Sequence, residues 1–383
     1  MPKHSSSNGK FRLAIYANLI YPGGESFVLA ELTRGLSERG FEITLMGRLE
    51  KRMIPFVHSL SWIHRLIPLR GKESVKQMLG CLAENPPDAV MISGNASLAI
   101  PSALLLKKPI FWRVIGHPKW WHSVRGTPHK ETKRVVAMIG HVSQRVIAVS
   151  NFVKSCFTQE GFRHVETIYE GCDTHYFSPN ARERLEFRKE FGLTPHDVAV
   201  GILANVDWQK RHEIVIRALA ALRQHNLSLK FFFVGGAFND HMRQQESILR
   251  QLIKQQGLDR QIIFTGFRLD KRRVMNGLDL LAFPFLDEGF GLSVLEGMSL
   301  EKPVVVNSSG ALPEIVTHNQ DGIVVESENP AALAKAMHHI LRNPLKAKAL
   351  GEKARQKVIK KFSLDRPILA YERLLKKNVS RNV

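Results

Sequence analysis

Short apolar runs alternate with segments of helical spacing along most of the chain. The run at 12–17 is followed by Val28, Leu32 and Leu36, which recur at helical spacing until Gly40. A short apolar run indicates a buried strand, and a recurrence every three or four residues indicates a helix that covers it. Continued alternation of this kind predicts βα units, and therefore parallel sheets in doubly wound α/β domains.

The alternation occurs in two series, separated by a charged segment. It pauses near 177–180, and we interpret the highly charged residues 181–197 as a connection. Residues 48–75 show no clear pattern. The predicted strands are 12–17, 41–47, 89–93, 110–114, 146–149 and 165–169, then 198–204, 229–234, 261–265, 278–284, 303–307 and 322–325. The predicted helices are the segment that ends at Gly40, 97–106, 131–144, a helix capped by Ser150 or Asn151, 213–223, 242–256, 292–299 and the residues from 329 to the end of the chain.

One stretch of the second series combines a glycine loop with two carboxylates. The loop after the strand at 278–284 contains Glu288, Gly289 and Gly291, and a short apolar helix at 292–299 follows. A strand, a glycine loop and a helix present backbone N–H groups to an anion or a sugar. Glu296 lies one turn inside the helix and can point toward the same edge as the loop. The alternative is that both carboxylates only decorate a tight turn.

Length and composition predict a two-domain protein of a reducing compartment. The chain has 383 residues, 44% of them hydrophobic, which is enough for two cores. Its three cysteines show neither a disulfide framework nor a zinc spacing. No signal-peptide pattern and no apolar run of about 20 residues is present, so we expect a cytoplasmic protein. The dinucleotide motif Gly-x-Gly-x-x-Gly is absent, which argues against a dehydrogenase.

The strong positive charge leaves three interpretations open. The formal net charge is +20, from 55 Lys and Arg against 35 Asp and Glu. Such a surface attracts polyanions, and Trp120 and Trp121 in a basic loop favour an anionic membrane surface. The charge can also serve only to keep the protein soluble. Nucleic-acid binding is the third interpretation, but no nucleic-acid motif is recognisable and the basic residues are dispersed over both halves.

Eight short motifs together resemble those of glycosyltransferase family 4, in the same order and spacing. They are Gly23-Gly24-x-Ser26, Ile147-Ala-Val-Ser-Asn-Phe-Val153, Ile168-Tyr-Glu-Gly-Cys-Asp-Thr174, Asp207-Trp-Gln-Lys210, Phe264-Thr-Gly266, Glu288-Gly-Phe-Gly291 with Glu296, Lys302-Pro-Val-Val305, and Gly310-Ala-Leu-Pro-Glu314. Each is weak alone, but the series is specific and spans roughly residues 12 to 375. The family consists of retaining glycosyltransferases of the GT-B fold.

The resemblance implies a fold and an activity. It implies an N-terminal acceptor-side domain at 1–180 and a donor domain at 181–363, both Rossmann-like and facing each other. A helix within 364–383 would cross back to the first domain. The activity would be transfer of a hexose from a UDP- or GDP-sugar to a saccharide or lipid-linked acceptor, in cell-surface polysaccharide or lipopolysaccharide synthesis. No cofactor is implied, and the absence of any Asp-x-Asp pair leads us to expect no metal.

The resemblance also implies roles for individual residues. Glu296 would hold the ribose hydroxyls and Glu288 the transferred sugar, while Lys210 would offset charge on the leaving diphosphate. His117 matches a histidine position near the transferred sugar, and a structural role is its alternative. The catalytic candidates are therefore His117, Lys210 and Glu288. The donor-binding candidates are Gly23, Gly24, Asn205, Lys210, Arg211, Gly266, Phe267, Glu288, Gly289, Phe290, Gly291, Leu292 and Glu296.

Four positions depart from the family's usual residues. Asn205 stands where an arginine is usual and Arg211 where glycine is common, so diphosphate binding would depend more on Lys210. Glu170 replaces a frequent asparagine and Ala311 a frequent glycine. These departures leave open a second hypothesis, in which the fold binds a sugar nucleotide but no longer transfers the sugar.

Overall fold

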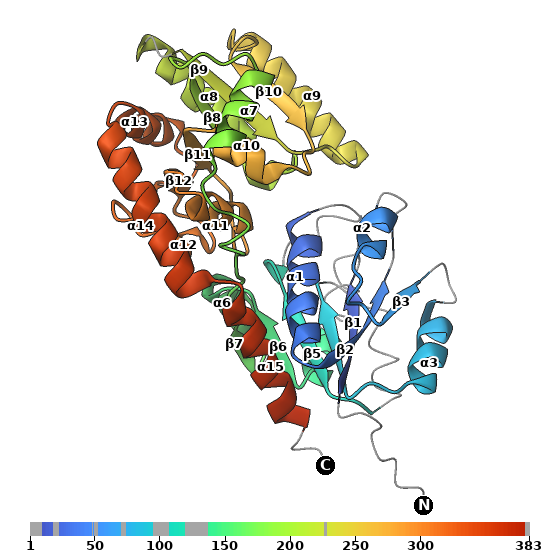
Figure 1. Ribbon diagram of the computed structural model, residues 1–383. Helices are drawn as coiled ribbons and strands as arrows, with labels where there is room; N and C mark the ends of the chain where they lie inside the picture. Colours follow the sequence, from blue (N-terminus) through green and yellow to red (C-terminus); the bar gives the residue numbers. More distant parts are fainter. Residues whose placement is uncertain are drawn as a thin grey trace, which may run out of the picture. The chain divides into compact units, whose positions relative to one another are not determined.

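The chain consists of two compact α/β units, each with one parallel sheet (Figure 1). The computed structural model describes residues 10–17, 23–47, 49, 53–69, 74–94, 107–118, 137–225 and 228–379. Unit 1 comprises residues 1–170 together with 364–383, and unit 2 comprises residues 171–363. Among the described residues, no helix has both the length and the apolar content to cross a membrane.

Unit 1 has seven described strands in the order β3-β2-β1-β4-β5-β6-β7. The order reverses between β1 and β4, which makes the sheet doubly wound. The strands are β1 (Phe11–Ala17), β2 (Phe41–Gly47), β3 (Arg65–Pro68), β4 (Ala89–Ser93), β5 (Ile110–Val114), β6 (Arg145–Ala148) and β7 (Val165–Thr167). The helices are α1 (Gly24–Glu38), α2 (Ile54–His58), α3 (Ser74–Glu84), α6 (Asn151–Gln159) and α15 (Asp365–Val379).

The last helix of the chain, α15, completes the core of unit 1. Ile368, Tyr371 and Leu375 of this helix are buried in the same cluster as side chains of β1, β2 and α1. The fit against α1 is close, because a Cβ added to Gly35 would lie 2.2 Å from Cδ1 of Ile368. The hydrophobic core of unit 1 is therefore built from both ends of the chain.

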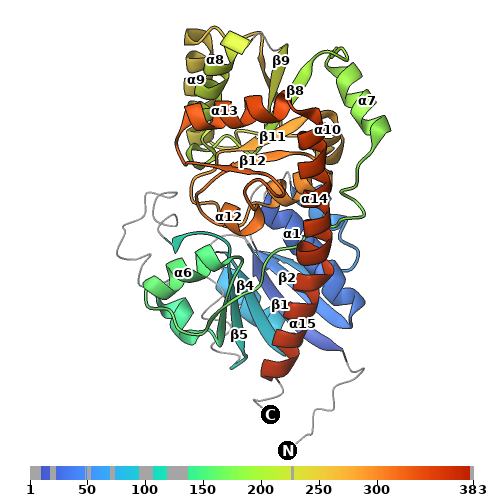
Figure 2. The same cartoon turned by 90° about the vertical axis from the view of Figure 1, so that its left-hand side faces the viewer.

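Unit 2 has six described strands in the order β10-β9-β8-β11-β12-β13, with a reversal between β8 and β11. β8, β9, β11 and β12 are labelled in Figure 2. The strands are β8 (Val198–Leu203), β9 (Leu229–Val234), β10 (Ile262–Gly266), β11 (Leu280–Phe283), β12 (Val304–Asn307) and β13 (Ile323–Val325). The helices are α7 (Ala181–Glu190), α8 (His212–Leu222), α9 (Asp240–Gln255), α10 (Lys271–Gly277), α11 (Leu292–Ser299), α12 (Leu312–Ile315), α13 (Pro330–Leu341) and α14 (Pro344–Phe362). The predicted class of two doubly wound parallel α/β units is confirmed.

The division between the units lies after Glu170, ten residues before the boundary expected at 180. The segment that follows is held by unit 2. The backbone N–H of Cys172 donates to the carbonyl of Phe362 at 2.8 Å. The Ser299 hydroxyl donates to the carbonyl of Phe177 at 2.6 Å. These bonds fix the segment on α11 and α14.

The prediction that residues 181–197 form a connection is wrong, because most of them form the helix α7. The Asn180 side chain caps this helix by accepting from the N–H of Glu183 at 3.0 Å. Phe187 is fully buried, and a Cβ added to Gly277 of α10 would lie 2.0 Å from its ring. Arg182, Glu186, Lys189 and Glu190 of α7 are exposed, whereas Phe187 and Arg188 are buried on the side of the helix that packs on α10.

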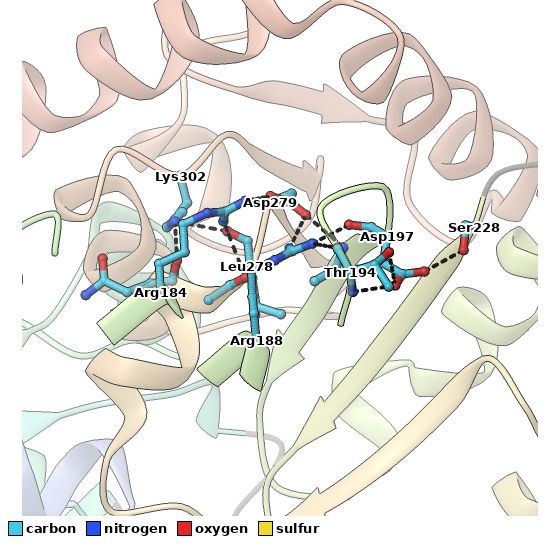
Figure 3. A network of polar contacts seen from close by, with 11 residues as sticks. Arg184, Arg188, Thr194, Asp197, Ser228, Leu278, Asp279 and Lys302 are labelled. Atoms are coloured by element: carbon cyan, nitrogen blue, oxygen red, sulfur yellow. Dashed lines mark hydrogen bonds and ion pairs between the residues drawn. The ribbon is translucent and has the colours of Figure 1, made fainter. Parts of the chain in front are cut away.

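A polar network at the start of β11 ties α7 to the sheet (Figure 3). Arg184 and Arg188 both pair with Asp279, at 2.5 and 3.2 Å. Lys302 donates to the carbonyls of Asn276 and Leu278 at 2.7 and 2.9 Å. Burial lowers the pKa of the Lys302 ammonium to about 8. Arg184, Arg188 and Lys302 therefore connect neighbouring elements of unit 2.

The other differences from the sequence-based expectation concern short elements. The helices α2, α3, α10 and α12 and the strand β3 were not predicted. Ser150, one of two candidates for the N-cap of α6, is the residue that accepts from the N–H of Val153. The predicted helix at 97–106, the first part of the helix at 131–144 and the tryptophans at 120 and 121 lie outside the described residues.

Candidate functional site

The candidate site of unit 2 lies at the point where its strand order reverses. β8 and β11 are neighbours in the sheet and run parallel, so the loops that follow them leave from the same edge. In an open α/β sheet, ligands bind beyond the carboxyl ends of the strands at this reversal. The two loops touch, because the N–H of Leu286 donates to the carbonyl of Gln209 at 2.8 Å.

Lys210 and Glu288 are joined across these two loops. Lys210 closes a 3₁₀ turn, Trp208–Lys210, which the carboxylate of Asp207 caps by accepting from the N–H of Gln209. Nζ of Lys210 lies 2.5 Å from Oε2 of Glu288 and 4.4 Å from the ring centroid of Phe285. The structure therefore brings together two of the three catalytic candidates.

A third loop, after β12, holds the backbone of Glu288 in place. The N–H of Ala311 donates to the carbonyl of Glu288 at 2.9 Å. The N–H of Asp287 donates to the Ser309 hydroxyl at 2.7 Å. Gly310 has a φ of +65°, and a Cβ there would lie 2.3 Å from the amide nitrogen of Glu288. Only glycine fits this approach, so the motif that contains it serves to position Glu288.

The glycine loop ends at the N-terminus of α11 as the sequence predicts. Gly291 has a φ of +100° and precedes Leu292, the first residue of the helix. No side chain caps this end. Phe290, a donor-binding candidate through its backbone, has a buried side chain whose ring packs on Phe362 at a centroid distance of 6.1 Å. The helix start therefore combines a positive dipole end with a left-handed glycine.

Glu296 is paired with a lysine that sequence reasoning missed. Nζ of Lys271, the first residue of α10, forms a hydrogen-bonded ion pair with Oε1 of Glu296. The same Nζ lies 5.0 Å from the ring centroid of Phe177. Two parallel strands need a crossover between them, and that rule could have revealed a helix between β10 and β11. Both glutamates are therefore held by lysines.

The remaining candidates of unit 2 form a neighbouring group after β8, β9 and β10. The carboxamide oxygen of Asn205 accepts from the N–H of Gly236 at 3.5 Å. The N–H of Gly235 donates to the carbonyl of Gly266 at 3.0 Å. The ring of Phe267 packs edge-on against Phe238. Asn205 thus has a local structural bond, in contrast to the diphosphate contact expected of an arginine at this position.

Arg211 occupies a strained position and is already engaged by carboxylates. Its φ of +50° lies in the left-handed region, which explains why glycine suits this position. Its guanidinium pairs with Glu328 at 2.5 Å and with Glu213 at 3.2 Å. A phosphate would therefore compete with two carboxylates for Arg211, whereas Lys210 has one carboxylate partner.

His212 is a buried, neutral histidine beside this site. It is 1% exposed, and neither ring nitrogen has a hydrogen-bond partner among the residues that the structure describes. Burial, and then the positive charge of Lys210, lower the pKa of His212 to about 3. Since a free histidine titrates near pH 6.5, the unfolded chain binds more protons than the folded chain between pH 3 and 6.5. The stability that neutral His212 contributes is therefore lost as the pH falls below about 6.5.

We expect His212→Leu to make the protein more resistant to acid. Leucine cannot be protonated and no hydrogen bond is lost. The variant should gain about 2 kcal/mol of unfolding free energy relative to wild type at pH 5, and almost none of that gain at pH 7.5. Urea unfolding at the two pH values measures this difference. His241→Gln, at an exposed position of α9, is the control. A shift of His212→Leu that is equal at both pH values would contradict the assignment.

Of the candidates of unit 1, Gly23 and Gly24 lie at the reversal of its sheet between β1 and β4, whereas His117 follows β5, the next strand beyond β4. Gly23 and Gly24 precede and begin α1, after β1. His117 follows β5, and its ring lies 6.2 Å from that of Phe152. Gly23 has an extended backbone that any residue can adopt. The backbone conformation within unit 1 therefore does not explain why glycine occupies positions 23 and 24.

A buried charged network lies beside these residues and was not predicted. Arg113, which is 2% exposed, donates to the Ser93 hydroxyl at 2.7 Å and to Glu170 at 2.6 Å. The Ser93 hydroxyl in turn donates to Glu25 at 3.1 Å. Burial raises the pKa of the Glu25 carboxyl. Glu170, one of the departures from the family pattern, is therefore the partner of a buried arginine.

No group that could hold a metal is found among the described residues. Nowhere in this part of the chain do three or more His, Cys, Asp or Glu side chains come together in a suitable arrangement. Cys81, Cys156 and Cys172 form no disulfide with one another. Burial raises the pKa of the Cys172 thiol. The site is thus made of lysines, carboxylates and backbone groups.

Fold and site agree with the comparison to protein families. The model of glycosyl transferases group 1 matches residues 183–357, and that of glycosyltransferase family 4 matches residues 22–176. The chain belongs to this family of GT-B glycosyltransferases. The first model covers the strand reversal of unit 2 with Lys210, Glu288 and Glu296, and the second covers Gly23, Gly24 and His117.

Individual relatives are distant. An uncharacterised glycosyltransferase of Methanocaldococcus jannaschii is 29% identical over 206 residues, 52% of this chain and 51% of that protein. The chain thus spans about half the length of that relative. A GDP-mannose-dependent alpha-(1-6)-phosphatidylinositol monomannoside mannosyltransferase of Mycobacterium tuberculosis is 26% identical over 313 residues, 78% of each chain. The crystal structure of HepE from Anabaena with UDP and glucose shares the fold, with a TM-score of 0.85, 20% identity and coverage of 96% of this chain and 100% of that chain.

Proposed function

We propose that this protein is a retaining glycosyltransferase that transfers a hexose from a UDP- or GDP-sugar to a saccharide or lipid-linked acceptor. The observation that carries the proposal is the pair Lys210–Glu288, which joins the loops after β8 and β11 beside the open N-terminus of α11. A cation and a helix N-terminus together suit a diphosphate, and a carboxylate suits sugar hydroxyls. The names of the relatives from M. tuberculosis and Anabaena support a nucleotide-linked sugar as donor.

The proposed reaction exchanges one bond to the anomeric carbon for another on the same face of the sugar. The bond from C1 to the β-phosphate oxygen breaks, and a bond from C1 to the acceptor oxygen forms. The acceptor's hydroxyl proton passes to the departing phosphate oxygen, so the products are a glycoside and a nucleoside diphosphate. Lys210 would stabilise the negative charge on that phosphate. This scheme requires no side-chain nucleophile, no metal and no cofactor.

The two glutamates have different roles in this scheme. Glu296, inside α11, would accept hydrogen bonds from the ribose hydroxyls, whereas Glu288, in the loop, would contact the transferred sugar. By the family resemblance, His117 would lie near the transferred sugar, and the backbone of Gly23 and Gly24 near the diphosphate or the acceptor. Binding and turnover should therefore respond differently to changes at Glu296 and Glu288.

We expect a UDP- or GDP-sugar to raise the melting temperature and to be consumed when an acceptor is present. The test is a thermal-shift panel of UDP, GDP and ADP with their common sugars, followed by assays of nucleotide release. Glu296→Gln should weaken nucleotide binding by about tenfold, because two hydrogen bonds to a charged group are weakened. Glu288→Gln should lower turnover more than it lowers nucleotide affinity. Equal loss of nucleotide affinity in both variants, with turnover of Glu288→Gln intact, would contradict the division of roles.

A second candidate function is a sugar-nucleotide-binding subunit that transfers nothing. Asn205 favours this second function, because its side chain accepts a hydrogen bond from the loop after β9 and carries no positive charge. The same assays separate the two functions. Wild type that binds a nucleotide but consumes no donor with any acceptor would support the binding subunit.

The acceptor is proposed to be a saccharide or lipid-linked glycan of the cell surface. The net charge of +20 supports attachment of a cytoplasmic enzyme to an anionic membrane. Sedimentation with vesicles extends the same set of assays. Binding to anionic vesicles and not to neutral ones is expected. Equal partitioning to both, or to neither, would remove the membrane from the proposal.

A further inference from the structure

Three consecutive basic residues open α10, and one of them differs from the other two in its partner. Arg272 pairs with Glu183, and Arg273 pairs with Glu190 at 2.8 Å, so both tie α10 to α7. Lys271 instead pairs with Glu296 of α11. The arginines therefore hold two helices together, whereas the lysine reaches a residue of the proposed donor site.

The Lys271–Glu296 pair lies on a largely apolar floor. The side chain of Glu296 is 12% exposed and that of Lys271 is 24% exposed. Phe177 lies beneath the ammonium, and Cys172 is close enough for both charges to affect its thiol. Both of these residues are buried. An ion pair is strengthened in such surroundings, and its two groups remain partly accessible.

The chemistry of the pair suits a vicinal diol. A carboxylate only accepts hydrogen bonds and an ammonium only donates them. The 2′- and 3′-hydroxyls of ribose each donate and accept, so adjacent groups of both kinds can satisfy both hydroxyls. A sugar that lacks the 2′-hydroxyl would leave part of this arrangement unsatisfied, and sites built in this way discriminate strongly against such an analogue.

We propose that Lys271 is a specificity-determining residue of the donor site, which acts with Glu296 to distinguish ribonucleotides from 2′-deoxyribonucleotides. This inference rests on the proposed function and refines its donor site. Lys271 orients the carboxylate of Glu296 and donates to a ribose hydroxyl. The ligand class is a ribonucleoside diphosphate, alone or as its sugar conjugate.

The test compares a ribonucleoside diphosphate with its 2′-deoxy analogue by calorimetry. The probe is UDP or GDP, whichever wild type binds more tightly. Wild type should prefer the ribose form by about tenfold or more. Lys271→Met should lower affinity for the ribose form by about tenfold and lower it less for the 2′-deoxy form, so that the preference narrows. Lys271→Arg should retain most of the preference.

Arg273→Met is the matched control, because Arg273 lies on the same helix, has a similar exposure of 29% and pairs away from the site. It should leave the ratio of the two affinities unchanged. Since the ratio is measured on folded protein, it does not depend on the stability of a variant. An equal loss for both forms in Lys271→Met, or no change in either, would overturn the inference. Failure of wild type to bind any nucleoside diphosphate would overturn the proposed function itself.

Discussion

Lys210→Ala is expected to lower kcat by about 10²–10³-fold and to change nucleotide affinity much less. The reason is that charge builds on the β-phosphate oxygen only as its bond to the sugar breaks. A preorganised cation that faces this charge contributes mainly to the transition state. Nζ of Lys210 is held by Glu288 and by the face of Phe285, so it is ordered before the donor arrives. Steady-state kinetics with the donor found in the binding panel measure the effect.

Two variants serve as controls, one at another lysine and one at Lys210 itself. Lys254→Ala, at an exposed position of α9, should leave kcat unchanged. Lys210→Arg keeps the charge but changes its shape, and should recover part of the rate. A change of less than threefold for Lys210→Ala would show that the cation acts elsewhere than on the leaving group.

Arg113→Met is expected to lower the unfolding free energy of unit 1 by about 3–5 kcal/mol. Methionine fills much of the arginine's volume, so the main effect is that Glu170, with a side chain only 5% exposed, loses its counter-charge. A buried carboxylate without a partner is costly, and Glu25 lies in the same network through Ser93. Hydrogen exchange of the β4 and β5 amides reports this loss within unit 1.

Two further variants make the interpretation specific. Arg113→Met combined with Glu170→Met removes both charges and should recover much of the lost stability. Arg34→Met removes an ion pair with Glu31 on the surface of α1 and should cost less than about 1 kcal/mol. If Arg34→Met and Arg113→Met cost the same, the pair Arg113–Glu170 would have no special role.

The sheets could be predicted because their strands are buried on both faces. Residues 198–203 are such a strand, and an apolar run bounded by polar residues identifies it without knowledge of its neighbours. The loop from Glu288 to Gly291 could be predicted for a related reason, since its glycines and carboxylates are adjacent in sequence. Local patterns therefore predicted the loop that carries Glu288 and the start of α11.

Other features depend on contacts between distant residues. Arg113 and Glu170 are 57 residues apart, and the sequence around each residue does not indicate that the two are partners. α7 was not predicted, because the many charged residues of the segment outweigh its one buried phenylalanine, Phe187, in the sequence pattern. Lys271 was missed because α10 is short and begins with three basic residues, which on sequence alone indicate a solvated loop. In each case tertiary packing, and not local propensity, decides the outcome.

The contribution of α15 to unit 1 has a consequence for the synthesis of the chain. Unit 2 ends at residue 363, so its whole sequence is synthesised before that of unit 1 is complete. Unit 1 precedes unit 2 in the chain but lacks Ile368, Tyr371 and Leu375 until α15 is synthesised, and its apolar surface on α1 stays uncovered until then. Because domains fold as units once their sequence is available, unit 1 cannot complete its core until the whole of unit 2 has been synthesised.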